Sequence, residues 1–225
     1  MNKIYNDMYV GGRWWPVEKT FSDINPSDDS EWARVPDVGV AEVRNAIDSA
    51  HHAFENWSKL PFNQRAHFMT KIAEIFEKRK MEVVTALRTE AGGWFGKSIF
   101  EASYVPEVFC AAAAMNYQSI GEVIPSEFGK LSMAIRRPVG VVSVISPWNF
   151  PTILTSRGIA FALAAGNTVV LKPSEETPYC GGLLFAEIFE EAGVPGGVLN
   201  VVTCSRDNVS VVGEELIENP LVKGI

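Results

Sequence analysis

The chain has 225 residues, a length that allows one large domain or one domain with an appendage. Apolar residues make up 47% and charged residues 21%, a balance typical of a globular protein that buries a core. The formal net charge of −7 argues against nucleic acid or an anionic membrane as the main partner.

Three cysteines, Cys110, Cys180 and Cys204, lie far apart and form no CxxC pair. The sequence therefore predicts neither a disulfide framework nor a metal site. No apolar run near the N-terminus is long enough for a signal peptide, and no segment approaches the length of a membrane span. We expect a cytoplasmic protein.

Residues 1–137 are predicted to form a mixed layer of helices and hairpins. Gly11 and Gly12 indicate a hairpin turn ahead of Arg13-Trp14-Trp15. Apolar residues then recur at helical spacing over 40–57 and 68–76, and a third helix is expected around 98–119. An extended pattern over 121–137 is typical of a second hairpin.

From residue 138 the chain alternates between strands and helices. The apolar run VGVVSVIS predicts a strand buried on both faces, and further strands are expected at TVVLK, VLNVV and LVKGI. Helices are expected between them at 152–165, 179–192 and 208–218. This order predicts an α/β fold with a Rossmann-like parallel sheet, incomplete at the C-terminus, in residues 138–225.

Ligands of such sheets bind at the carboxyl ends of the strands. The first strand is followed by Pro147-Trp148-Asn149-Phe150-Pro151. The amide of Asn149 is a neutral donor of the kind that holds a developing oxyanion, and Trp148 and Phe150 could form the wall of an apolar tunnel. The alternative is a loop asparagine with satisfied hydrogen bonds beside two core aromatics.

The second strand is followed by Lys172-Pro173-Ser174-Glu175. Glu175 accepting from ribose hydroxyls would favour NAD, whereas Lys172 could donate to the ribose or tolerate a 2′-phosphate. The alternative is that the acidic residues only stabilise the N-terminus of the next helix. No G-x-G-x-x-G follows a strand, which disfavours an ordinary Rossmann dehydrogenase.

Residues 145–178, ISPWNFPTILTSRGIAFALAAGNTVVLKPSEETP, resemble the most diagnostic stretch of the aldehyde dehydrogenase superfamily. The segment EAGVPGGVLNVV, at 191–202, is similar to the block that follows it, and upstream segments fit the N-terminal part of the family in order. The resemblance implies NAD(P)-dependent oxidation of an aldehyde to a carboxylic acid through a cysteine thiohemiacetal. It also implies a Rossmann variant that lacks the G-x-G-x-x-G loop.

The resemblance assigns roles to individual residues. Asn149 becomes the oxyanion-hole residue, and Lys172 and Glu175 become contacts of the adenosine ribose, with Glu175 favouring NAD over NADP. The cofactor-binding set is completed by Ile145, Ser146, Pro147, Trp148 and Ser174, and the substrate tunnel is expected to be lined by Tyr104, Phe109 and Phe150.

The resemblance also implies an oligomer and a type of substrate. The hairpin of residues 122–137 would belong to an oligomerisation element, so we expect a homo-oligomer for the full-length protein. The segment GGWFGKSIFE and the tunnel aromatics point to the aromatic, benzaldehyde-type branch. One departure is Thr203-Cys204-Ser205-Arg206-Asp207, which stands where the family has glycines near the adenine.

The family's nucleophilic cysteine and its general-base glutamate come after the position equivalent to Ile225. We therefore expect this chain to be the N-terminal part of such an enzyme, without the nucleophile and inactive by itself. The alternative is a non-catalytic cofactor-binding or assembly fragment.

Overall fold

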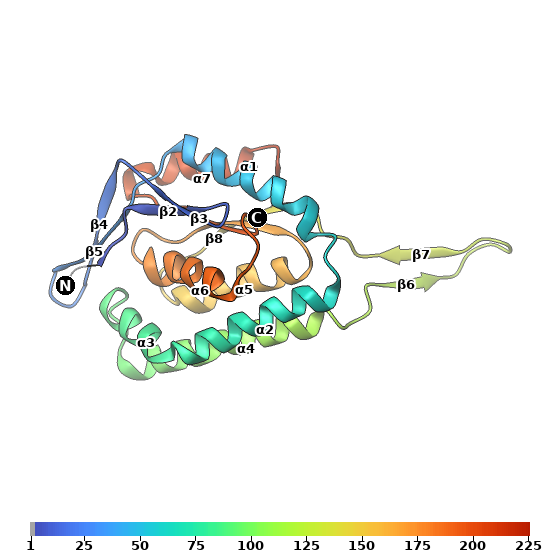
Figure 1. Ribbon diagram of the computed structural model, residues 1–225, viewed down its shortest axis with the longest axis horizontal. Helices are drawn as coiled ribbons and strands as arrows, with labels where there is room; N and C mark the ends of the chain where they lie inside the picture. The colour runs from blue at the N-terminus through green and yellow to red at the C-terminus, as the bar shows by residue number, and fades with distance from the viewer. Residues whose placement is uncertain (1–2) are drawn as a thin grey trace.

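A six-stranded sheet lies at the centre of the computed structural model, which describes residues 3–225 (Figure 1). The strand order is β11-β8-β9-β10-β2-β3. Four strands are mutually parallel: β8 (Val141–Ile145), β9 (Thr168–Lys172), β10 (Leu199–Val201) and β11 (Val222–Gly224). The predicted α/β fold with a Rossmann-like parallel sheet is confirmed.

The N-terminal hairpin extends this sheet instead of staying in a separate layer. Strand β2 (Asp7–Val10) pairs antiparallel with β10, and β3 (Arg13–Pro16) pairs antiparallel with β2. Glycines permit the close approach: a Cβ on Gly12, whose φ is +75°, would lie 2.7 Å from the Cα of Gly196. The sheet is therefore mixed, and it includes strands from both sides of residue 137.

Helices cover both faces of the sheet (Figure 1). One face carries α1 (Val40–Trp57) and α7 (Val209–Glu218), and the other carries α5 (Pro151–Ala164) and α6 (Leu184–Ala192). An outer layer packs against α5 and α6 and consists of α2 (Phe62–Lys78), α3 (Lys80–Thr89) and α4 (Phe95–Met115). The sequence predicts each of these helices except α3.

Strand β9 lies at the centre of the hydrophobic core. All five of its residues are buried, and they alternate between the two faces as strand geometry requires. Val169 and Leu171 belong to the apolar cluster on the side of α5 and α6, whereas Val170 belongs to the cluster on the side of α1 and α7. This double burial explains the apolar run Val169-Val170-Leu171 between Thr168 and Lys172.

The remaining elements lie at the periphery. A small sheet has the order β1 (Lys3–Ile4), β5 (Glu31–Pro36), β4 (Thr20–Ile24), and the hairpin of β6 (Gly121–Ile124) and β7 (Ser132–Ile135) projects from the body (Figure 1). Two short helical turns, η1 (Tyr179–Leu183) and η2 (Arg206–Asn208), precede α6 and α7. None of the helices within residues 3–225 has the length and apolar character needed to cross a membrane.

Candidate functional site

The two loops singled out in the sequence lie next to each other. Strands β8 and β9 are paired in register, so that Ile145 stands opposite Lys172 at their carboxyl ends. The backbone N–H of Ser146 donates to the carbonyl of Lys172 at 3.0 Å. The loop containing Asn149 and the loop containing Glu175 therefore begin from adjacent points of one sheet edge.

Asn149 is exposed at the end of β8. Its side-chain amide makes no hydrogen bond to any residue that the structure describes, and the neighbouring Trp148 is 60% exposed. The alternative of a satisfied asparagine between two core aromatics therefore does not describe this loop. The amide N–H groups of Asn149 are available to a ligand.

The first turn of α5 is held by a residue that sequence reasoning missed. Glu101 on α4 is fully buried, and its Oε1 accepts hydrogen bonds from the backbone N–H and the hydroxyl of Thr152, at 2.9 and 3.0 Å. A signal for such a partner exists in the sequence: Phe150 precedes Pro151 at the helix start and has no side-chain acceptor to cap it.

The loop after β9 brings a buried cation close to a carboxylate. Lys172 is only 3% exposed, and its Nζ donates to the carbonyl of Pro173 at 3.0 Å. Ser174 is also buried, and its hydroxyl lies 3.4 Å from a carboxylate oxygen of Glu175. These predicted cofactor contacts are therefore clustered at the end of a single strand.

Arg206 was not predicted as a site residue, yet it lies against Glu175. Its Nε is 3.4 Å from Oε1 of Glu175, and its Nη2 is 2.7 Å from Oε1 of Glu176. Burial acts to raise the pKa of Glu175, but the residue's own backbone N–H, Lys172 and Arg206 outweigh it, so that the pKa is lowered. The departure from the family pattern at residues 203–207 thus introduces a second cation beside the expected ribose contact.

A cleft of about 400 Å³ opens beside these groups. Its lining includes Trp148, Glu175, Thr177 and Arg206. The hydroxyl of Thr177 is buried and has no hydrogen-bond partner within residues 3–225. The carboxylate of Glu175 and the guanidinium of Arg206 are an acceptor and a donor that fit the ribose of a dinucleotide in this cleft.

The residues predicted to line the substrate tunnel separate into two environments. Phe150 is half-buried and lies under the ammonium of Lys97, whose Nζ is 4.8 Å from the ring centroid. Tyr104 is half-buried on α4, where its hydroxyl accepts a hydrogen bond of 2.7 Å from Nη2 of Arg157 on α5. Both aromatic side chains therefore contact neighbouring elements through a cation.

Phe109 does not belong with them. Its side chain is fully buried, stacks on Phe76 with ring centroids 5.8 Å apart and meets Phe189 at 6.0 Å. The expectation that Phe109 lines a tunnel is therefore wrong, because its face of α4 turns toward α2 and α6. It is a core residue.

The three thiols differ in their surroundings. Burial raises the pKa of Cys180, and the carboxylate of Glu90 raises it further; burial also raises the pKa of Cys204, to about 11. Cys110 is exposed, but it lies six residues after Tyr104, about 240° around the helix. In the described part of the chain, no group of three or more His, Cys, Asp or Glu side chains is arranged to hold a metal ion.

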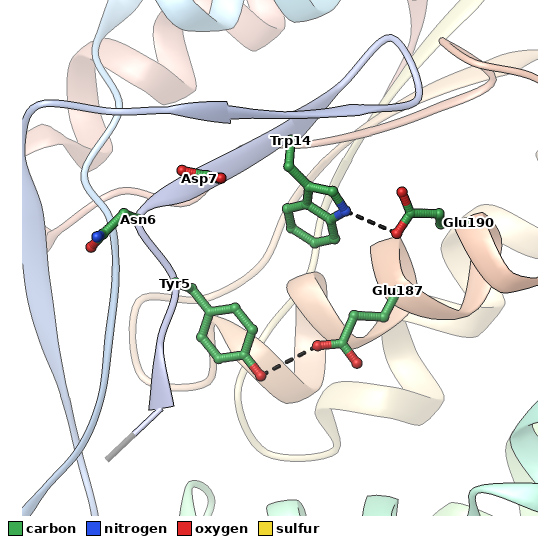
Figure 2. Close-up of a pocket in the computed structure, with 6 residues that line it drawn as sticks. All are labelled: Tyr5, Asn6, Asp7, Trp14, Glu187 and Glu190. Atoms are coloured by element: carbon green, nitrogen blue, oxygen red, sulfur yellow. Dashed lines mark hydrogen bonds between the residues drawn. The ribbon is translucent and has the colours of Figure 1, made fainter. Parts of the chain in front are cut away.

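A second recess, of about 410 Å³, lies between the N-terminal hairpin and α6 (Figure 2). Two hydrogen bonds cross it: Nε1 of Trp14 donates to Glu190 at 2.9 Å and the hydroxyl of Tyr5 donates to Glu187 at 3.3 Å (Figure 2). None of the predicted site residues lines this recess. The two hydrogen bonds join the hairpin to α6, and the recess is separate from the site at the carboxyl ends of β8 and β9.

Comparison with known proteins identifies the family. The profile described as the aldehyde dehydrogenase family matches residues 14–225. The mitochondrial succinate-semialdehyde dehydrogenase of Rattus norvegicus is 37% identical over 223 residues, which are 97% of this chain and 42% of that protein. The chain thus spans less than half the length of this curated relative.

Solved structures are similar over the same region. A NAD-dependent benzaldehyde dehydrogenase from Corynebacterium glutamicum superposes with a TM-score of 0.91 at 35% identity, covering 97% of this chain and 47% of that one. A salicylaldehyde dehydrogenase from Pseudomonas putida G7, complexed with salicylaldehyde, gives a TM-score of 0.94 at 29% identity, covering 99% and 46%. The chain described here belongs to the aldehyde dehydrogenase family.

Proposed function

We propose that this chain is the oxyanion-holding and cofactor-binding part of an enzyme that oxidises an aldehyde to a carboxylic acid with NAD(P). The observation that carries the proposal is the unbonded amide of Asn149 at the end of β8, beside the cation and carboxylate at the end of β9. Family membership supports the reaction class. NAD(P), when bound, accepts a hydride from the substrate.

In this proposal each residue binds or orients the aldehyde or the cofactor. The N–H groups of Asn149 donate to the carbonyl oxygen of the aldehyde as negative charge develops there. Glu175, which lines the cleft, holds the adenosine ribose together with Lys172 and Ser174, which lie behind it at the end of β9. The backbone of residues 145–148 runs along the cofactor between these two groups.

We propose that the nucleophile is a cysteine outside these 225 residues. Cys180 and Cys204 are buried with raised pKa values, the opposite of what an attacking thiolate requires. Cys110 lies on a different face of α4 from Tyr104, the residue that contacts Arg157 of α5. In this proposal the 225-residue chain alone does not turn over an aldehyde. A non-catalytic binding or assembly fragment is the second candidate, favoured by the same three thiols.

NAD is the proposed preferred cofactor, because the carboxylate of Glu175 accepts from two ribose hydroxyls and repels a 2′-phosphate. Arg206 moderates this preference, since it pairs with Glu175 and carries a charge that attracts a phosphate. Similar proteins use either cofactor: the benzaldehyde dehydrogenase is described as NAD-dependent, and a similar structure from E. coli is described as an NADP-dependent enzyme.

Arg157 supports a proposal about the substrate. Its guanidinium lies over the ring of Tyr104, 5.0 Å from the centroid, and no carboxylate within residues 3–225 forms an ion pair with it. It follows Phe150 by seven residues on α5, and helical side chains lean toward the N-terminus, so it lies along the same side as Phe150. We propose that it binds an oxygen acceptor, or stacks on a ring, at the far end of the aldehyde.

The projecting hairpin supports a proposal of self-association. Large apolar side chains are exposed along β6, β7 and the turn between them: Val123, Phe128, Leu131 and Met133. A two-stranded hairpin with exposed edges and an apolar surface pairs readily with another chain. We propose that this hairpin is the contact through which a homo-oligomer forms.

The oxyanion assignment is tested by Asn149→Ala in the complete enzyme. Turnover is expected to fall by about 10²-fold or more while the dissociation constant of the cofactor stays unchanged, because only the transition state uses this amide. The matched control is Asn63→Ala, which removes an exposed asparagine from α2. Normal turnover in Asn149→Ala, or an equal loss in both variants, would contradict the role.

A further inference from the structure

The loop that carries Asn149 is fixed by its ends rather than by the asparagine itself. At the first end, Ser146 is buried and bonded through its backbone to β9. Its hydroxyl is also hydrogen bonded to the hydroxyl of Thr155 at 2.7 Å, which ties the same residue to α5. Because the side chain of Asn149 makes no bond within residues 3–225, its direction depends on how firmly both ends of the loop are held.

The other end depends on a contact from a different helix. Phe150 offers no cap to α5, and Pro151 at the first helical position has no N–H. The first free N–H therefore belongs to Thr152, and it donates to Glu101 of α4. The negative charge of Glu101 also suits the positive end of the helix dipole. A buried carboxylate thus fixes the chain three residues after Asn149.

Lys97 completes this contact and extends it to the loop. Its Nζ forms an ion pair of 3.0 Å with Oε2 of Glu101, one turn further along α4, and this oxygen accepts no hydrogen bond from the other described residues. The same ammonium lies over the ring of Phe150, the residue directly after Asn149. One cation therefore compensates the buried carboxylate and contacts the end of the loop.

We propose that Lys97 and Glu101 are positioning residues for Asn149. Transferring the two charges of an ion pair from water into the protein interior is unfavourable. A Ser, Thr, Asp or Asn at position 150 would cap the first turn of α5 without such a pair. What the pair adds is a rigid connection between α4, the start of α5 and the ring of Phe150. The catalytic meaning of this connection rests on the proposed function, whereas the connection itself does not.

The test compares variants that weaken the connection with a matched control. Thr152→Val deletes the hydroxyl bond to Glu101, and the double variant Lys97→Met, Glu101→Gln removes both charges while leaving an acceptor for the N–H of Thr152. The control is Thr168→Val at the start of β9, where a buried hydroxyl donates to the carbonyl of Ala50 at 2.9 Å. All three variants lose buried polar interactions, but only the first two lose them at the loop.

The direct readout is the pair of side-chain amide signals of Asn149 in a ¹⁵N-labelled sample, assigned by their loss in Asn149→Asp. We expect these signals to shift or broaden in both test variants and to stay unchanged in Thr168→Val, although the melting temperature falls in Thr168→Val as it does in Thr152→Val. In the complete enzyme, kcat is expected to fall by about 10- to 100-fold in the test variants with KM little changed, because a misplaced donor weakens transition-state binding.

Unchanged Asn149 signals in both test variants would overturn the proposal, and so would an equal change in Thr168→Val. Failure of the positioning role and failure of the proposed function give different results. If the Asn149 signals respond as expected, but the complete wild-type protein oxidises no aldehyde with NAD or NADP, the positioning contact stands and the proposed function fails.

Discussion

Replacing Asp23 by asparagine is expected to stabilise the protein above neutral pH. Asp23 on β4 and Glu90 after α3 are both only 2% exposed, and burial followed by the charge of Glu90 raises the pKa of Asp23 to about 10. Glu90 accepts backbone hydrogen bonds from Tyr179 at 2.6 Å and Cys180 at 2.7 Å, so it is the partner that carries the charge. Burial raises the pKa of Glu90 as well, but these hydrogen bonds act to lower it, so we infer that Asp23 holds the proton of the pair in the folded state.

The magnitude follows from the linkage between protonation and folding. An unfolded aspartic acid ionises near pH 4, whereas folded Asp23 ionises near pH 10, so between these values the folded state binds one extra proton. Stability then falls as pH rises, by up to about 1.4 kcal/mol per pH unit. The side-chain N–H of asparagine can donate to Glu90 in place of the carboxylic acid O–H, and the amide does not ionise in this pH range. Allowing for the different geometry of its amide, we expect a gain of about 1–3 kcal/mol at pH 8.

The assay is thermal denaturation at a series of pH values from 6 to 9. A gain of this size corresponds to a rise in melting temperature of about 2–4 °C per kcal/mol for a chain of this length, and the rise should grow with pH. Asp48→Asn, at an exposed position of α1, is the control and should have no effect. An Asp23→Asn protein that is less stable than wild type, or equally sensitive to pH, would refute the protonated state of Asp23.

Two further predictions concern Arg157 on α5 and Phe109 on α4. Arg157→Leu should raise the KM for an aldehyde with a carboxylate at its far end by about tenfold or more, because one charged hydrogen bond is lost. The KM for an unsubstituted aliphatic aldehyde should stay the same, and equal changes in the two KM values would exclude the assignment. Phe109→Ala should lower the free energy of unfolding by about 3–5 kcal/mol, as expected for a buried ring between Phe76 and Phe189, and urea denaturation with normal stability would argue against the core position.

The sequence predicts the parallel sheet well because burial on both faces leaves an unmistakable pattern. Strand β9 has three apolar residues in a row between Thr168 and Lys172, and all five of its residues are buried. Its partner β8 is also mostly apolar, although it contains Ser143 and its buried residues alternate with partly buried ones. Strands β4 and β5 carry mixed polar and apolar residues, since they lie in a small peripheral sheet, and they were not predicted. The pairing of Tyr9 with Val201 also escapes prediction, because a local pattern says nothing about which distant strand a hairpin will join.

The candidate site divides in a similar way. Asn149, Lys172 and Glu175 can be selected as candidates because each lies at or just after the end of a predictable strand, where parallel sheets bind their ligands. Glu101 and Arg206 act through partners 51 and 31 residues away, so their contacts depend on how helices and loops pack. Phe109 was misassigned although Val105 and Ala112 are buried at helical spacing from it, a period that marks it as part of the core.

The central claim is that the cofactor binds at the carboxyl end of β9. The most direct measurement is a calorimetric titration of wild type, Glu175→Ser and Glu190→Ser with NAD and with NADP; Glu190 lies in the separate recess beside α6 (Figure 2). We predict that Glu175→Ser weakens NAD binding by about 10- to 100-fold and shifts the preference toward NADP, while Glu190→Ser leaves both affinities unchanged. Unaltered NAD binding in Glu175→Ser, or its loss in Glu190→Ser, would contradict the claim.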